Sequence, residues 1–193
     1  MKLLEERILR DGAALDEDVL KVDSFLNHQV DAAFLTELGQ AFRERFAGCQ
    51  VDKILTIETS GIGIAVAAAP AFGSVPVLFA KKNKTKNIAG DVYISQAESF
   101  TQDRRPYNIF VSKEFLKAGE KVLLMDDFLA NGSALAALTD IARQAGAEVV
   151  GAAIVIEKAF QPGGKLIRDK GVRVESLAVI AEMSEEKGVV FAD

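Results

Sequence analysis

The strongest constraint on the fold is a set of four short apolar runs, rich in branched residues, that recur along the chain. They are Ile54–Ile57, Val75–Ala80, Val122–Met125 and Val149–Ile156. Runs of this kind are typical of strands that are buried on both faces of a parallel sheet. Two of the gaps between them, residues 61–71 and 132–145, have helical character. This alternation predicts an α/β fold, with right-handed crossovers and helices on both faces of the sheet.

Two further segments carry weaker patterns. Near the N-terminus, Leu4 and Ile8 form a short helical stripe, and a longer helix is predicted after Asp31 from Phe34, Leu38, Phe42 and Phe46, which recur every four residues. Residues 81–106 begin with Lys81, Lys82, Lys84 and Lys86 and hold one alternating segment, Val92–Phe100. We predict a long mobile loop there, folded as a hairpin outside the packed core.

The composition excludes several classes of protein. Of 193 residues, 49% are hydrophobic and 26% charged, which is typical of a folded chain rather than a disordered one. The single cysteine, Cys49, rules out an internal disulfide and suits a reducing compartment. A net charge of −5 argues against a nucleic-acid partner. The sequence shows neither a signal peptide nor an apolar stretch of about 18 residues, so we expect a cytoplasmic protein with no membrane partner.

The first candidate for chemistry follows the run Val122–Met125. It reads Asp126-Asp127-Phe-Leu-Ala130-Asn131-Gly132-Ser133-Ala134 and leads directly into a helical segment. Ligands of an open parallel sheet bind beyond the carboxyl ends of its strands, and small residues before a helix let backbone N–H groups approach a phosphate. Two carboxylates beside that phosphate suit sugar hydroxyls or a phosphate-bound Mg²⁺, so the pattern indicates a phosphorylated ribose. The alternative is an ordinary strand–helix joint with turn and cap residues.

A second candidate follows the run Ile54–Ile57. Glu58-Thr59-Ser60-Gly61 is again a small, hydroxyl-bearing turn before a helix, and its N–H and hydroxyl groups could hold another anion. Taken alone it is also a common helix cap. Two anion sites at neighbouring strand ends indicate one ligand that carries phosphate at both ends.

Five segments together resemble a known family. They are Leu20-Lys-Val-Asp-Ser-Phe-Leu-Asn-His-Gln29, Glu58-Thr-Ser-Gly61, Asp126-Asp-Phe-Leu-Ala-Asn-Gly132, Val155-Ile-Glu-Lys-Ala-Phe-Gln-Pro-Gly163 and Arg173-Val-Glu-Ser-Leu-Ala178. The acid pair with its loop and helix resembles the phosphoribosyl diphosphate motif of type I phosphoribosyltransferases. The full set, which spans residues 20–178, resembles the small bacterial xanthine phosphoribosyltransferases. Asn131-Gly132 departs from the Thr-Gly of the wider family but matches that branch, whereas the Lys-rich loop matches least well.

The resemblance implies the type I phosphoribosyltransferase fold, with residues 1–193 as a single domain. A small hood over the parallel sheet would be formed by the terminal segments, at about 1–30 and 158–193, and the mobile hairpin loop would span about 81–106. The resemblance also implies a homodimer, with either the helix near Phe34–Phe46 or the sheet edge as its contact surface.

The implied activity is transfer of the 5-phosphoribosyl group from phosphoribosyl diphosphate (PRPP) to N9 of xanthine, which yields XMP and pyrophosphate in purine salvage. The resemblance places Asp126 and Asp127 at the ribose hydroxyls as catalytic residues. It assigns the 5-phosphate to Ala130, Asn131, Gly132, Ser133 and Ala134, the diphosphate to Glu58, Thr59, Ser60 and Gly61, and the purine to Leu20, Asn27 and Lys158. Mg²⁺ would be carried with PRPP, without a dedicated protein metal site.

The chemistry of the proposed base-binding residues agrees with this assignment. Lys158 follows the run Val149–Ile156, where it can donate to the 6-oxo group of a purine, and Asn27 can recognise a second oxo edge. Phe160 offers a face for base stacking. Position alone would favour a surface lysine and a core aromatic residue instead. His28, next to Asn27, is interpreted as structural rather than catalytic.

Three alternative functions stay open. The first is an enzyme of the same fold that uses guanine, hypoxanthine or adenine. The second is a PRPP-binding regulator of transcription, which is disfavoured because the sequence shows neither a helix–turn–helix segment nor a basic face. The third is a nucleotide-binding module without turnover. An assay with each base and PRPP separates them.

Overall fold

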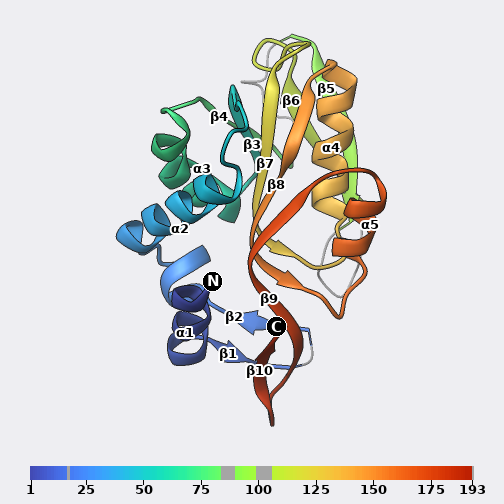
Figure 1. Cartoon of the computed structure of the whole chain (residues 1–193). Coiled ribbons are helices and arrows are strands. Elements are labelled where there is room, and N and C mark those ends of the chain that lie inside the picture. The colour runs from blue at the N-terminus through green and yellow to red at the C-terminus, as the bar shows by residue number, and fades with distance from the viewer. Residues whose placement is uncertain (17, 84–89, 99–105, 193) are drawn as a thin grey trace.

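The computed structural model describes residues 1–16, 18–83, 90–98 and 106–192, and its centre is a six-stranded sheet (Figure 1). The strands are β3 (Lys53–Ile57), β4 (Val77–Ala80), β7 (Lys121–Leu129), β8 (Glu148–Lys158), β9 (Val174–Ser184) and β10 (Gly188–Phe191). Their order in the sheet is β10–β9–β8–β7–β3–β4. All neighbours pair in parallel except β10, which runs antiparallel to β9. The predicted parallel sheet is confirmed, with one antiparallel strand added at its edge.

The predicted apolar runs coincide with strands of this sheet. β3 is buried along its whole length, and β7 and β8 along most of theirs, as expected for strands covered on both faces. β7 and β8 continue past their apolar runs, so Asp126, Asp127 and Lys158 belong to the strands themselves. Because β3, β7 and β8 are parallel neighbours, their carboxyl ends meet at one edge of the sheet.

Helices cover both faces of the sheet, as predicted. α2 (Ala32–Arg45) and α3 (Ser60–Ala68) lie on one face, and α4 (Ser133–Ala145) and α5 (Gly163–Asp169) lie on the other (Figure 1). Each pair packs on its own apolar core. Leu123 and Met125 of β7 join the core of α2 and α3, while Leu124 between them joins the core of α4. This alternation is the two-residue period of a strand.

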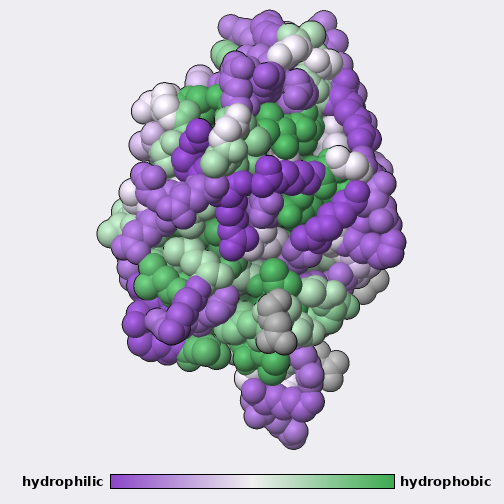
Figure 2. All heavy atoms as spheres, in the orientation of Figure 1, coloured by the Kyte–Doolittle hydropathy of each residue, from purple (hydrophilic) through white to green (hydrophobic). Residues whose placement is uncertain are grey.

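α2 begins where the sequence predicts, because the Asp31 side chain accepts a hydrogen bond from the N–H of Phe34. Phe34, Leu38 and Phe42 of this helix, and Phe46 directly after it, are at most 6% exposed. These side chains belong to the chain's own core, and a subunit contact through the other face of this helix stays a prediction. Figure 2 shows hydrophilic and hydrophobic residues interspersed on the viewed face. The homodimer stays a prediction, with the sheet edge as its other candidate surface.

The predicted helix over 61–71 is formed by two elements. α3 ends at Ala68, and a 3-10 turn, η2 (Ala69–Phe72), follows it. Pro70 has no N–H to donate, which favours the end of the regular helix here. Gly73 then closes the turn with a φ of 86°.

A hairpin of β5 (Val92–Glu98) and β6 (Pro106–Ser112) packs against α4 (Figure 1). A hairpin is therefore present as predicted, but its second strand lies almost entirely beyond the predicted range of 81–106. Its expected place outside the core is wrong, because Ala97 and Ile109 are at most 1% exposed within the core of α4. The alternation of β5 is that of a strand with one buried face, since Ile94 on the other face is 45% exposed. Lys84, Lys86 and Phe100 lie outside the described residues.

Segments from the two ends of the chain pack together in the lower part of Figure 1. They are α1 (Lys2–Asp11), β1 (Ala13–Ala14), β2 (Leu20–Lys21), the π-helix η1 (Asp23–Asn27), β10 and the adjacent part of β9. Leu4 and Ile8 of α1 share a core with Ile180 of β9, and the amino group of Met1 donates to the carbonyl of Leu177. These segments lie within the ranges expected for the hood, about 1–30 and 158–193, but α5 and most of β9 in the second range belong to the sheet and its covering helices. The exact hood boundaries and the single-domain assignment stay predictions.

Candidate active site

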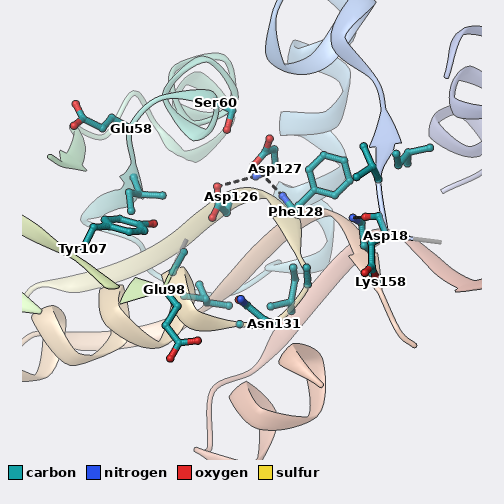
Figure 3. Close-up of a pocket in the computed structure, with 18 of the residues that line it drawn as sticks. Asp18, Glu58, Ser60, Glu98, Tyr107, Asp126, Asp127, Phe128, Asn131 and Lys158 are labelled. Atoms are coloured by element: carbon teal, nitrogen blue, oxygen red, sulfur yellow. Dashed lines mark hydrogen bonds between the residues drawn. The ribbon is translucent and has the colours of Figure 1, made fainter. Parts of the chain in front are cut away.

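The carboxyl ends of β3, β7 and β8 border a cavity of about 440 Å³ (Figure 3). Ten of the fifteen residues predicted for the site line it: Leu20, Glu58, Ser60, Asp126, Asp127, Ala130, Asn131, Gly132, Ala134 and Lys158. The five predicted residues outside its lining are Asn27, Thr59, Gly61, Ser133 and Phe160. In the view of Figure 3, the acid pair lies between Glu58 and Ser60 on one side and Lys158 on the other.

The acid pair lies at the centre of the cavity. Asp126 and Asp127 are only 6% and 8% exposed. Asp126 accepts a hydrogen bond from the N–H of Asp127 at 3.0 Å, and Asp127 accepts one from the N–H of Phe128 at 3.0 Å, both drawn in Figure 3. Burial, followed by the charge of Asp127, raises the pKa of Asp126 well above its usual value. Asp126 therefore keeps its proton to a higher pH than an exposed carboxyl does.

This raised pKa predicts that Asp126→Asn stabilises the fold at neutral pH. An acid whose pKa is higher in the folded state contributes stability below its unfolded pKa of about 4, and this contribution is lost as the pH rises through the folded value. Asparagine does not ionise, so the variant escapes that loss. Thermal midpoints measured from pH 4 to pH 8 should show a difference in favour of the variant that grows with pH. A constant difference, or one that shrinks, would contradict the assignment.

The β7–α4 turn, Ala130–Gly132, joins the acid pair to the N-terminus of α4. Gly132 has a φ of 80°, which favours glycine, and the Asn131 side chain accepts from the N–H of Ser133 at 2.9 Å. The Ser133 hydroxyl faces the hairpin, where its oxygen accepts from the N–H of Glu98 at 2.5 Å. The turn thus brings small residues and a helix N-terminus to the cavity, which is an arrangement suited to an anion.

The turn after β3 reaches the cavity through Glu58 and Ser60. Glu58 accepts from the N–H of Lys82 at 2.5 Å, and the peptide bond between Glu58 and Thr59 is cis. Gly61 has a packing role that the sequence does not reveal. A Cβ there would lie 2.1 Å from the Thr56 hydroxyl and 3.2 Å from the Asp126 carboxylate. Gly61 therefore lets α3 begin directly against the acid pair.

Three of the residues predicted to bind the purine base, Lys158, Asn27 and Phe160, lie in three different places. Lys158 is 4% exposed, donates to the carbonyl of Asp18, and lies 5.2 Å from the centre of the Phe128 ring. Burial lowers the pKa of Lys158, against the charges of Asp18, Asp16 and Asp127. Asn27 is beside the cavity, where its amide donates to Asp127 at 3.2 Å. Phe160 is 41% exposed and lines a second cavity with residues of the β9–β10 hairpin.

Several lining residues were not predicted from the sequence. They are Asp18, Val19, Lys82, Glu98, Tyr107 and Phe128. Phe128 directly follows the acid pair and could have been found from that position. Tyr107 could not, because it reaches the cavity only through the pairing of β6. Burial, followed by the charge of Asp126, raises the pKa of Tyr107.

Within the described residues, no group of three or more His, Cys, Asp or Glu side chains is arranged to hold a metal ion. None of the described helices is long and apolar enough to cross a membrane.

Residues 23–185 match the model of the phosphoribosyl transferase domain. The chain therefore belongs to the phosphoribosyltransferase family, and the resemblance found in the sequence is confirmed. It is similar over nearly its whole length to two curated proteins. Xanthine phosphoribosyltransferase 1 of Clostridium perfringens is 53% identical over 187 residues, which cover 97% of this chain and 98% of that protein. Xanthine phosphoribosyltransferase of Clostridioides difficile is 54% identical over 180 residues, which cover 93% and 94%.

Solved structures support the fold. Adenine phosphoribosyltransferase of Saccharomyces cerevisiae aligns with a TM-score of 0.73 at 19% identity, covering 92% of this chain and 99% of that chain. The enzyme of the same name from Thermoanaerobacter pseudethanolicus gives 0.73 at 18% identity, covering 91% and 98%. The predicted type I phosphoribosyltransferase fold is thus confirmed.

Proposed function

We propose that this chain transfers the 5-phosphoribosyl group from PRPP to N9 of xanthine, giving XMP and pyrophosphate. The observation that carries the proposal is the cavity itself. It is lined by a buried acid pair, by two turns of small residues and by a buried lysine. The near full-length similarity to proteins named xanthine phosphoribosyltransferase supports xanthine as the base.

PRPP is the ligand that suits the two turns best. Its 5-phosphate would bind at the β7–α4 turn, where the N-terminus of α4 favours a negative charge. Its diphosphate would bind at Glu58–Gly61. The ribose between them would present its hydroxyls to Asp126 and Asp127. Both carboxyls have oxygens at the cavity that can accept hydrogen bonds from hydroxyl groups.

The base would lie on the side of Lys158. Its ammonium group can donate to the 6-oxo group, and Phe128 and Leu20 supply apolar surface at the cavity wall. Asn27 would read the C2 edge with the amide N–H that does not bind Asp127. The stacking role of Phe160 stays a prediction, and it requires the ring to leave the second cavity.

The reaction needs no protein nucleophile. The C1–diphosphate bond breaks through an oxocarbenium-like state while N9 adds from the opposite face and the base releases its imidazole proton to water. The residues mainly position the reactants and stabilise separating charge. Asp126 and Asp127 face the sugar, where positive charge develops. Mg²⁺ is expected to arrive with PRPP, held by phosphate oxygens and water, and to supply positive charge to the leaving diphosphate.

The proposal is tested by initial rates with PRPP and each of xanthine, guanine, hypoxanthine and adenine. Xanthine should give the highest kcat/KM, with the 6-oxopurines ahead of adenine, because the base subsite offers a lysine donor. A higher kcat/KM with adenine would overturn the assignment of xanthine. Binding of PRPP without turnover of any base would favour a regulator or a binding module.

A further inference from the structure

The turn before α5 lies directly against the β7–α4 turn. The N–H of Gly163 donates to the carbonyl of Ala130 at 2.9 Å. A Cβ on Gly163 would lie 2.3 Å from that carbonyl oxygen and 2.5 Å from the nitrogen of Gly132. These are backbone atoms, which cannot rotate away as the end of a side chain can. The close contact between the two turns therefore requires glycine at position 163.

An ion pair between a buried carboxylate and a partly exposed arginine fixes the other side of the same turn. Glu157 of β8 has a side chain that is 5% exposed, and Arg168 of α5 donates to both of its oxygens, at 2.6 and 2.8 Å. The hydroxyl of Ser176 on β9 donates to the same carboxylate at 2.5 Å. A Cβ on Gly164 would lie 2.0 Å from Glu157 Oε1. The two glycines thus lie between the β7–α4 turn and this three-residue cluster.

The opposite charges of Glu157 and Arg168 compensate each other within this cluster. Burial raises the pKa of Glu157. Hydrogen bonds from Arg168 and Ser176, with the charge of Arg168, lower the same pKa by a larger amount, so that it lies below its usual value. The carboxylate stays ionised and is matched by the guanidinium group. Bidentate pairs of this kind fix geometry as well as charge. Glu157, Arg168 and Ser176 do not line the active-site cavity, and their connection to it runs through Gly164, Gly163 and the β7–α4 turn.

We propose that Gly163 and Gly164, held by the Glu157–Arg168–Ser176 cluster, are positioning residues that set the β7–α4 turn in the geometry that binds the 5-phosphate of PRPP. This inference rests on the proposed function. It assigns a role in substrate binding to residues that do not touch the substrate.

The test is the affinity for PRPP, measured by calorimetry in the presence of Mg²⁺, together with separate KM values for PRPP and xanthine. Gly163→Ala should weaken PRPP binding about 10- to 100-fold, because a displacement of roughly 1 Å is enough for losses of this size. Arg168→Lys keeps the charge but loses the bidentate pair, and should weaken PRPP binding about 3- to 10-fold. The KM for xanthine should change less than the KM for PRPP in both variants. Since the Arg168 side chain is 44% exposed, Arg168→Lys remains decisive if Gly163→Ala does not fold.

Two controls match these changes. Gly63→Ala on α3 places its Cβ no closer than 3.9 Å to Leu35 and Val30, and should leave PRPP binding unchanged. Lys165→Ala removes an 81% exposed side chain from α5 and should do the same. Folded variants with wild-type affinity for PRPP, or equal losses for PRPP and xanthine, would overturn the inference while leaving the proposed function intact. Failure of the wild-type protein to bind PRPP would overturn both.

Discussion

Asp126→Asn and Asp127→Asn, made singly, should each lower kcat/KM by about 10²–10³-fold, because each removes an acidic group that we propose to face the sugar, where positive charge develops during the reaction. Asparagine keeps the size of the side chain. It also keeps one oxygen that can accept the backbone N–H now bound by each carboxylate. The loss should therefore appear in steady-state kinetics while circular dichroism shows a folded protein.

The matched control is Asp140→Asn, an exposed carboxylate on α4. It should keep wild-type kcat/KM. Full activity in both acid-pair variants, with well-folded protein, would mean that these carboxyls are structural.

The second large effect concerns the base. Lys158→Met keeps the apolar stem and removes the ammonium group, so it should weaken xanthine, guanine and hypoxanthine together. Asn27→Ala should cost xanthine more than hypoxanthine, because only xanthine has an oxo group at C2. Loss of a matched polar partner costs about 1–3 kcal/mol, or roughly 5- to 150-fold in kcat/KM.

The contact between Asn27 and Asp127 sharpens this second experiment. Removing the amide also takes a donor from Asp127, which should lower the rate with every base by a common factor. This common factor cancels in the ratio of kcat/KM for xanthine to kcat/KM for hypoxanthine. A change in the ratio therefore reports only on the contact between Asn27 and the C2 oxo group. His28→Ala, an exposed neighbour, should leave the ratio unchanged. An unchanged ratio in Asn27→Ala as well would place C2 recognition elsewhere.

β3, β7 and β8 were predictable because they are buried along most of their length and contain short, largely apolar runs. β9 was missed, since Glu175, Ser176 and Glu182 flank its short apolar run Leu177–Ala181 and the strand carries a mixed burial pattern. The burial of β5 was missed for a related reason. Its buried face is completed by small side chains such as Ala97, which pattern alone does not distinguish from a solvated alternation.

The acid pair and the two turns were predictable because each is local to one strand end. Contacts between distant segments were not. Asn27 reaches Asp127 across 100 positions, and Lys158 reaches the carbonyl of Asp18 across 140. The direction of Phe160 also depends on tertiary packing, because the turn after β8 decides which cavity its ring lines.

The most direct test of the account is the identity and ratio of the products formed from xanthine, PRPP and Mg²⁺. Chromatography with mass detection should show XMP and pyrophosphate appearing in equal amounts as xanthine is consumed. Release of pyrophosphate with ribose 5-phosphate and no XMP, or no consumption of xanthine by protein that binds PRPP, would contradict it.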